Sequence, residues 1–105
     1  MPQAGAAAVF DALADGNRRH LLTLLAERGS ATATELAAEL PVTRQAIAKH
    51  LAGLRAAGLV VPERKGRETR YRLTPAPLGE AAAWLTSVGA EWDERLEALR
   101  LQLEP

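Results

Sequence analysis

The chain contains no cysteine, and this absence excludes disulfides, thiolate metal sites and cysteine nucleophiles. Aromatic residues make up only 4%, so a core must be built largely from leucine, valine and alanine, which suits packed helices better than a β-sandwich. No run approaches the ~18 apolar residues of a membrane span, and the apolar start at 4–10 lacks the basic leader of a secretory signal. We expect a cytoplasmic protein with no membrane partner.

The chain also lacks a net charge, but its charges are unevenly distributed. The formal net charge is +0. Residues 42–73 hold eight basic and two acidic residues, a local charge of 8 − 2 = +6, which leaves −6 for the remainder. Segregation of this size creates a local positive field, and a phosphate backbone responds to the local field and not to the total.

The length of 105 residues and the 48% of hydrophobic residues suit one domain over residues 1–105. The spacing of Val9, Phe10 and Leu13 predicts a helix over 4–14. A leucine-rich face predicts a second helix over 18–28, for which we expect an N-cap at residue 17 (Asn17) and a stop at residue 29 (Gly29).

Residues 32–57 have the pattern of two helices joined by a tight turn. Thr32 stands three residues before Glu35, as in a capping box, and predicts a short helix to about residue 40. Thr43 then caps a second helix over 43–57, whose inward face has three apolar residues at helical spacing, Ile47, Leu51 and Leu54.

A β-hairpin is predicted over residues 60–73. Apolar residues at 59–61 indicate its first strand, and Tyr71 and Leu73 alternate with arginines in the second. The turn falls at 65–67, so the tip of the hairpin is basic. The expected fold class is therefore mainly α with a small β-hairpin.

Residues 77–104 predict a long helix, because apolar residues recur there every three or four positions. These residues form an apolar seam along one side of the helix. At 1.5 Å per residue its apolar stretch extends ~39 Å, whereas a compact domain of this size has a radius of gyration of ~13 Å. We therefore expect a second copy of the chain to cover the seam. The alternative is that Ser87 and Gly89 break the helix and fold its halves onto the core.

The second helix of the pair is a candidate for reading DNA. With its apolar residues inward, it exposes small residues and two long polar ones, Gln45 and Lys49. Small side chains allow close approach to groove walls, glutamine can pair with adenine, and lysine can reach guanine or phosphate. The alternative is that Gln45 and Lys49 only solvate the helix, but the adjoining turn and basic hairpin favour a DNA surface.

Several motifs follow one another in a fixed order: Val9–Asp15 with Arg18-Arg19, Thr34–Ala37, Ala46–Val60, and Arg64–Arg67 with Tyr71–Leu73. With these motifs the chain resembles the ArsR/SmtB family of winged helix-turn-helix repressors over nearly its whole length. The resemblance implies a homodimer joined through the first and last helices, which binds an inverted-repeat operator in double-stranded DNA and usually represses transcription.

By position, the resemblance implies a set of DNA-contacting residues on the recognition helix and in the wing: Thr43, Arg44, Gln45, Ala46, Lys49, His50, Arg64, Lys65, Arg67 and Arg70. We expect a dimer interface that includes one residue of the first helix and seven of the last: Phe10, Leu78, Leu85, Val88, Trp92, Leu96, Leu99 and Leu103.

The chain departs from the family's metal sensors. Thr32 and Thr34 occupy the region where the thiol-based sensors carry cysteines, and the last helix lacks the histidines of the zinc sensors. His20 and His50 are isolated, so we expect no metal and no cofactor, and the effector stays unidentified. The chain contains no Gly-rich phosphate loop and no activated nucleophile, so we do not expect an enzyme. A winged-helix module for protein–protein contact is the alternative to DNA binding.

Overall fold

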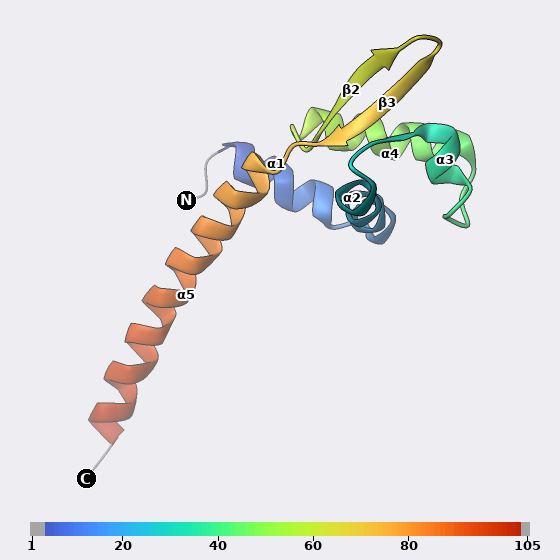
Figure 1. The fold of residues 1–105 in the computed structure, drawn as a ribbon. Coiled ribbons are helices and arrows are strands. Elements are labelled where there is room, and N and C mark those ends of the chain that lie inside the picture. Colours follow the sequence, from blue (N-terminus) through green and yellow to red (C-terminus); the bar gives the residue numbers. More distant parts are fainter. Residues whose placement is uncertain (1–3, 104–105) are drawn as a thin grey trace.

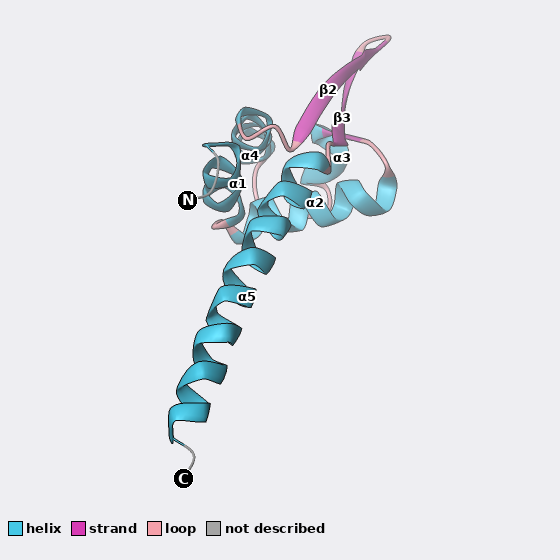
Figure 2. Ribbon diagram, turned by 90° about the vertical axis from the view of Figure 1, so that its left-hand side faces the viewer, coloured by secondary structure: helices cyan, strands magenta, loops and turns pink. Residues whose placement is uncertain are grey.

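The computed structural model describes the backbone of residues 4–103 and the side chains of residues 7–102. The elements follow the order α1 (Ala4–Leu13), α2 (Gly16–Arg28), β1 (Ala31–Thr32), α3 (Ala33–Ala37), α4 (Arg44–Ala56), β2 (Val60–Lys65), β3 (Glu68–Leu73) and α5 (Ala76–Leu103). Figure 2 shows that most of this range is helical. The predicted class, mainly α with a small β-hairpin, is confirmed.

Helices α1 to α4 form the body of the molecule, and two elements project from it in opposite directions. Figure 1 shows the hairpin β2–β3 leaving one end and α5 leaving the other. The principal extents are 70 × 25 × 21 Å and the radius of gyration is 18.4 Å, above the ~13 Å of a compact domain of this size. Helix α5 is continuous through Ser87 and Gly89, so the alternative of a broken helix is wrong.

The sheet has three antiparallel strands in the order β1-β3-β2. Strand β3 pairs with β2 along its whole length and with β1 at two positions, Ala31 to Tyr71 and Thr32 to Arg70. The sequence predicted only the two-stranded hairpin. Strand β1 was missed because two residues are too few to show the alternation that identifies a strand.

A continuous apolar core joins the four helices of the body to the first residue of β2. Its fully buried large side chains are aliphatic: Val9, Leu21, Leu25, Leu36, Ile47, Leu51, Leu54, Leu59 and Val60. Burying a side chain of this size contributes roughly 1.5–3 kcal/mol. The expectation of a leucine-based helical core is therefore confirmed.

The first residue of α2 is defined by a carboxylate. The Oδ1 atom of Asp15 accepts hydrogen bonds from the backbone N–H groups of Asn17 (2.8 Å) and Arg18 (3.2 Å). The N-cap is thus Asp15, and the prediction that Asn17 caps this helix is wrong because the helix begins at Gly16, two residues before its predicted start at 18. At the other end, Gly29 has a φ of 83°, in the left-handed region that favours glycine, which confirms it as the stop.

The predicted caps of α3 and α4 are confirmed. The backbone N–H of Glu35 donates to Thr32 Oγ1 at 3.1 Å, and the backbone N–H of Thr32 donates to Glu35 Oε1 at 2.9 Å. Thr43 Oγ1 accepts from the N–H of Ala46 at 3.1 Å. Helix α3 ends at Ala37, three residues earlier than predicted, and a turn continues the chain toward α4.

We predict that Asp15 makes folding pH-dependent. The backbone N–H of Arg18 is the largest cause that lowers the pKa of Asp15 below its usual range. A depressed pKa means that the stabilisation is present above the unfolded-state value of about 3.9 and is lost as the pH falls through the folded-state value. Urea denaturation should therefore show Asp15→Asn less stable than the wild type at pH 7, with the difference closing below about pH 4. Asp11→Asn, which changes a carboxylate that caps no helix, is the control. A difference that persisted unchanged to pH 2 would contradict the assignment.

Candidate nucleic-acid interface

Helix α4 divides its residues between the core and solvent. Its inward side chains are fully buried (Ile47, Leu51 and Leu54). Its outward ones are exposed (Arg44, Gln45, Lys49, Ala52 and Ala56). Of the other predicted contact residues here, Thr43 is exposed, whereas Ala46 and His50 are half-buried. The outward face consequently has the small residues and long polar side chains that entry into a groove requires.

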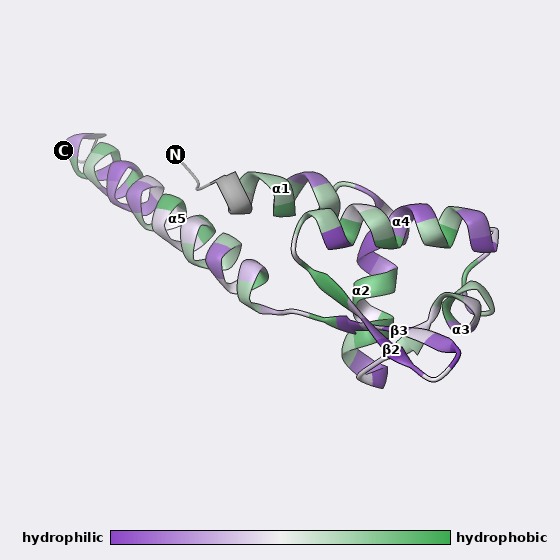
Figure 3. Cartoon of the chain, turned by 90° about the horizontal axis from the view of Figure 1, so that it is seen from above, coloured by the Kyte–Doolittle hydropathy of each residue, from purple (hydrophilic) through white to green (hydrophobic). Residues whose placement is uncertain are grey.

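The hairpin β2–β3 presents a basic tip. Arg64, Lys65 and Arg67 are all exposed there, and Figure 3 shows a hydrophilic far end on this hairpin. The turn depends on Gly66, whose φ of 61° is rarely adopted by residues with a side chain. The carbonyl oxygen of Gly66 accepts a hydrogen bond from Arg64 Nε at 3.1 Å, which orders the guanidinium beside the turn.

A surface groove separates the start of α4 from the hairpin. Its lining brings together residues of α3, of the start of α4 and of both hairpin strands: Thr32, Ala33, Thr34, Glu35, Thr43, Arg44, Gln45, Ala48, Arg64, Arg67, Glu68, Thr69, Arg70 and Tyr71. Six of the ten predicted DNA-contact residues lie on it. The other four, Ala46, Lys49, His50 and Lys65, do not. The hydroxyl-bearing Thr32 and Thr34 were not in the predicted set, although threonines at a helix start are a recognisable signal for contacts to phosphate.

The cations of this region fall into paired and unpaired groups. Arg70 pairs with Glu35 and Glu68, and Arg72 lies 3.7 Å from Glu63. Within the described part of the chain, no carboxylate lies within ion-pair distance of the remaining ones: Arg44, Lys49, Arg55, Arg64, Lys65 and Arg67. Six unpaired positive charges thus surround the groove and α4, where a polyanion would find them unneutralised.

The carboxylate of Glu35 sits at the inner edge of the groove. The backbone N–H of Thr32 is the largest cause that lowers the pKa of Glu35 below its usual range, and the positive charge of Arg70 lowers it further. Glu35 is therefore ionised at neutral pH and holds Arg70 by charge as well as by hydrogen bonding. Arg70, a predicted DNA contact, is thus already engaged by partners within the protein.

Behind the recognition surface, Arg18 of α2 lies against α4. A Cβ at Gly53 would come within 2.9 Å of Arg18 Cζ, so glycine leaves room for the guanidinium. Arg18 Nε and His50 Nδ1 are both buried without a hydrogen-bond partner. Arg18 belongs to one of the motifs on which the family resemblance rests, but its contact with Gly53 was not predicted from the sequence. A glycine in the interior of a predicted helix was the available signal for such a close contact.

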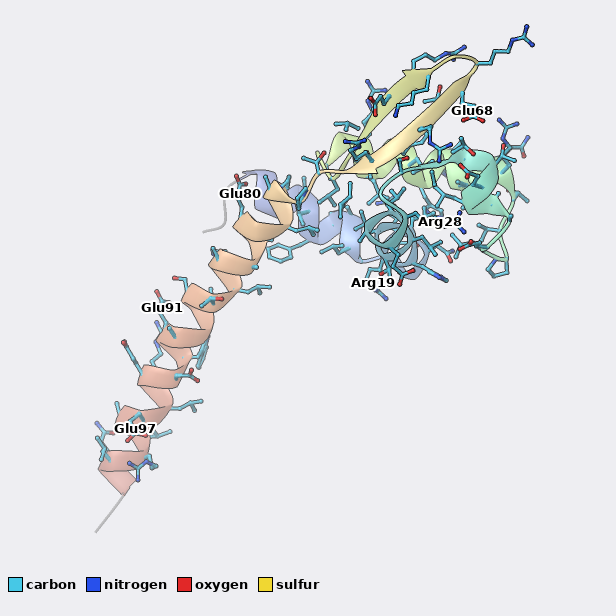
Figure 4. All side chains as sticks on the ribbon, viewed as in Figure 1. Arg19, Arg28, Glu68, Glu80, Glu91 and Glu97 are labelled. Atoms are coloured by element: carbon cyan, nitrogen blue, oxygen red, sulfur yellow. The ribbon has the colours of Figure 1, made fainter. Side chains whose placement is uncertain are left out.

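The apolar seam of α5 is largely exposed to solvent. Its distal residues are between 51% and 59% exposed (Leu85, Trp92, Leu96 and Leu99). Phe10 and Leu78 are half-buried and pack against the core, and the Phe10 ring lies 5.5 Å from that of Trp84 on α5. Val88 is half-buried, and the side chain of Leu103 lies outside the described residues. Figure 4 labels Glu80, Glu91 and Glu97 along this helix, whose far end lies away from the hairpin.

Within residues 4–103, no helix has both the length and the apolar character to cross a membrane. The same range holds no group of three or more metal-ligating side chains placed to hold an ion. The structure presents two helices joined by a turn, α3 and α4, followed by a basic β-hairpin, and residues of all these elements line one groove. This arrangement defines the winged helix-turn-helix class of DNA-binding proteins.

Comparison with known proteins gives the family. A helix-turn-helix domain family matches residues 13–63. The chain is 50% identical to the solved structure of an ArsR-like transcriptional regulator from Rhodococcus sp. RHA1, with a TM-score of 0.84 and coverage of 96% of this chain and 94% of that one. It is 48% identical over 66 residues to the HTH-type transcriptional regulator YuzN of Bacillus subtilis (57% of this chain, 72% of the relative). It is 36% identical over 67 residues to the arsenical resistance operon repressor of Escherichia coli (64% and 57%).

The chain belongs to the ArsR family and is a DNA-binding transcriptional regulator. The resemblance stated from its motifs is thereby confirmed. The individual contact residues are not tested by these comparisons and stay predictions.

We predict that the Thr43 cap stabilises α4. Replacing it by alanine removes the acceptor for the Ala46 N–H and should lower the free energy of unfolding by about 1 kcal/mol. Thr43→Ser keeps the hydroxyl and should cost little. Denaturant titrations without DNA measure this effect apart from any DNA contact. Equal losses for the two variants would show that the methyl group, and not the cap, is responsible.

Proposed function

We propose that this regulator acts in the cytoplasm as a homodimer that binds an inverted-repeat operator in duplex DNA and represses transcription. The observation that carries the proposal is the set of six unpaired cations on α4 and the hairpin, three of which (Arg44, Arg64 and Arg67) line the groove between these elements. Helix α4 would enter the major groove, and the hairpin would act as a wing that contacts the phosphate backbone. The name of the Escherichia coli relative supports repression as the outcome.

The two parts of the interface would contribute differently. Gln45 lies exposed in the first turn of α4, where the N-terminal residues of a recognition helix meet base edges. Arg64 lies near the end of β2 and Arg67 in the turn that follows, and both would meet phosphates. Sequence preference would therefore come from α4 and much of the affinity from the wing.

The exposed seam of α5 supports the dimer. Four large apolar side chains along one helix, each more than half exposed, form a surface that water disfavours and a second copy would cover. A two-fold axis would place the recognition helices about one DNA turn apart, ~34 Å, and an inverted repeat has the same symmetry.

We infer that the protein does not respond to cadmium or arsenic, the thiophilic elements named for some of its relatives. One solved relative is described as a cadmium metal-sensor, and a curated one as an arsenic resistance regulator. This chain has no cysteine at all, so it offers no thiolate to either element. We therefore propose a regulator whose effector is of another chemical kind.

We predict that Gln45→Ala and Arg67→Ala weaken binding in different ways. Loss of Gln45 should cost roughly 1–3 kcal/mol at one base position and relax preference there, because a base contact is lost. Loss of Arg67 should weaken operator and random duplex alike and reduce the salt slope by about 0.9, because a phosphate contact is lost.

Selection of bound sites from random duplex, followed by titrations at several salt concentrations, measures both effects. A wild-type protein whose binding ignores salt would instead favour a module that contacts another protein. Equal losses on both duplexes for both variants would refute the division of roles.

We predict that Leu96→Glu dissociates the dimer, since it places a charge in the apolar seam. Sedimentation should show a monomer where the wild type is a dimer, and affinity for the full inverted repeat should fall toward that for a half-site. Glu94→Ala changes an exposed position off the seam and should leave both measurements unchanged. A wild-type protein that sediments as a monomer would end the dimer proposal.

A further inference from the structure

Arg70 is the most internally connected cation of the DNA-binding region. Its Nε donates to Ser30 Oγ at 3.1 Å, and its Nη2 donates to the Ser30 carbonyl oxygen at 3.4 Å. Its Nη1 lies 3.1 Å from a carboxylate oxygen of Glu35 and 3.1 Å from one of Glu68. The side chain is only 24% exposed. All three guanidinium nitrogens are therefore occupied within the protein.

These contacts join segments that the backbone ladder joins only weakly. Arg70 belongs to β3, Ser30 precedes β1, and Glu35 lies in α3. Strand β1 has only two residues, so just two residue pairs hold the hairpin to the body through the sheet. Figure 1 shows that the rest of the hairpin projects beyond the helices. The angle of the hairpin relative to α3 and α4 consequently depends on side chains in its half nearer the body, among them Val60 in the core and Arg70 in the middle of β3.

The contact between Arg70 and Glu35 is well suited to hold the hairpin at a fixed angle. The Glu35 oxygen that faces Arg70, Oε1, also accepts the backbone N–H of Thr32 that begins α3. One carboxylate therefore fixes the start of α3 and the middle of β3 at once. A guanidinium, with its planar fork of donors, can hold a hydroxyl, a carbonyl and a carboxylate together, whereas the ammonium of lysine cannot span them.

We propose that Arg70 is a positioning residue that sets the angle of the wing, and not a residue that contacts DNA. It holds Arg64 and Arg67 where they reach the backbone of the duplex whose major groove receives α4. The proposal rests on the proposed function, and it replaces the expectation that Arg70 itself touches DNA.

The first test measures the angle without DNA. Because the chain has no cysteine, Lys65→Cys and Ala38→Cys introduce two specific spin-label sites, one at the wing tip and one after α3, both exposed. With labelled chain diluted into unlabelled chain, the parent should give one narrow distance distribution. Arg70→Gln should broaden it, and Arg72→Gln, which changes the neighbouring exposed arginine of β3, should not. A distribution that stays narrow in a folded Arg70→Gln variant overturns the proposal.

The second test separates positioning from contact by the sign of an effect on binding. Glu35→Gln keeps a side chain that can complete the capping box but removes one of the two carboxylate charges that hold Arg70. If Arg70 contacted phosphate, freeing it and removing a negative charge would tighten binding. We expect instead that binding to operator duplex weakens by on the order of tenfold, because wing phosphate contacts are lost.

Glu63→Gln is the matched control. It removes a carboxylate of β2 that lies within ion-pair distance of Arg72, at 3.7 Å, and not of Arg70, although Glu63 is the residue opposite Arg70 in the strand register. It should leave binding unchanged or tighten it slightly. If both variants tighten binding equally, Arg70 is not a positioning residue. If the wild type binds no duplex, the proposed function fails, and the spin-label result still decides whether Arg70 holds the wing.

Discussion

Burial of one face of α4 is the interaction on which the rest of the molecule depends. Ile47, Leu51 and Leu54 are fully buried, and their packing holds the helix by one side only. Because successive residues of a helix rotate by ~100°, anchoring that side fixes the direction of Gln45 and Lys49 to within a side-chain rotation. Apolar contacts on one face of α4 thus determine the direction of the polar face, and no further interaction is needed to keep that face toward solvent.

Much of this arrangement is readable in the sequence because its signals are local. Apolar spacing identified the helices and the hairpin, Thr32 with Glu35 identified a capping box, and glycines identified where helices end. The signals that failed are nonlocal or too short. Strand β1 exists only because β3 passes beside it, and Asp15 replaced Asn17 as cap because polar residues carry the first turn of α2.

For the candidate site, too, the sequence predicted what depends on neighbouring residues and missed what depends on distant ones. Counting charges along residues 42–73 indicated a basic surface, but a count treats every arginine alike. Only the fold distinguishes Arg70, which is held by Ser30 and two carboxylates, from Arg67, which has no carboxylate within ion-pair distance among the described residues. Pairing between residues forty positions apart leaves no trace in composition or periodicity, so the division of the cations had to come from the structure.

The reach of α5 has a consequence for how much folded protein a cell contains. In a lone chain, α5 (Ala76–Leu103) packs against the body through residues near its start, Leu78, Ala81 and Trp84, and most of the rest lacks the tertiary packing from which helices in proteins draw most of their stability. In a dimer of the proposed kind, mutual packing would supply the missing support, so that stability becomes a function of abundance through mass action. Dilution would then weaken the fold and DNA occupancy together, and the regulator's own synthesis rate would help to set how much of the operator is occupied.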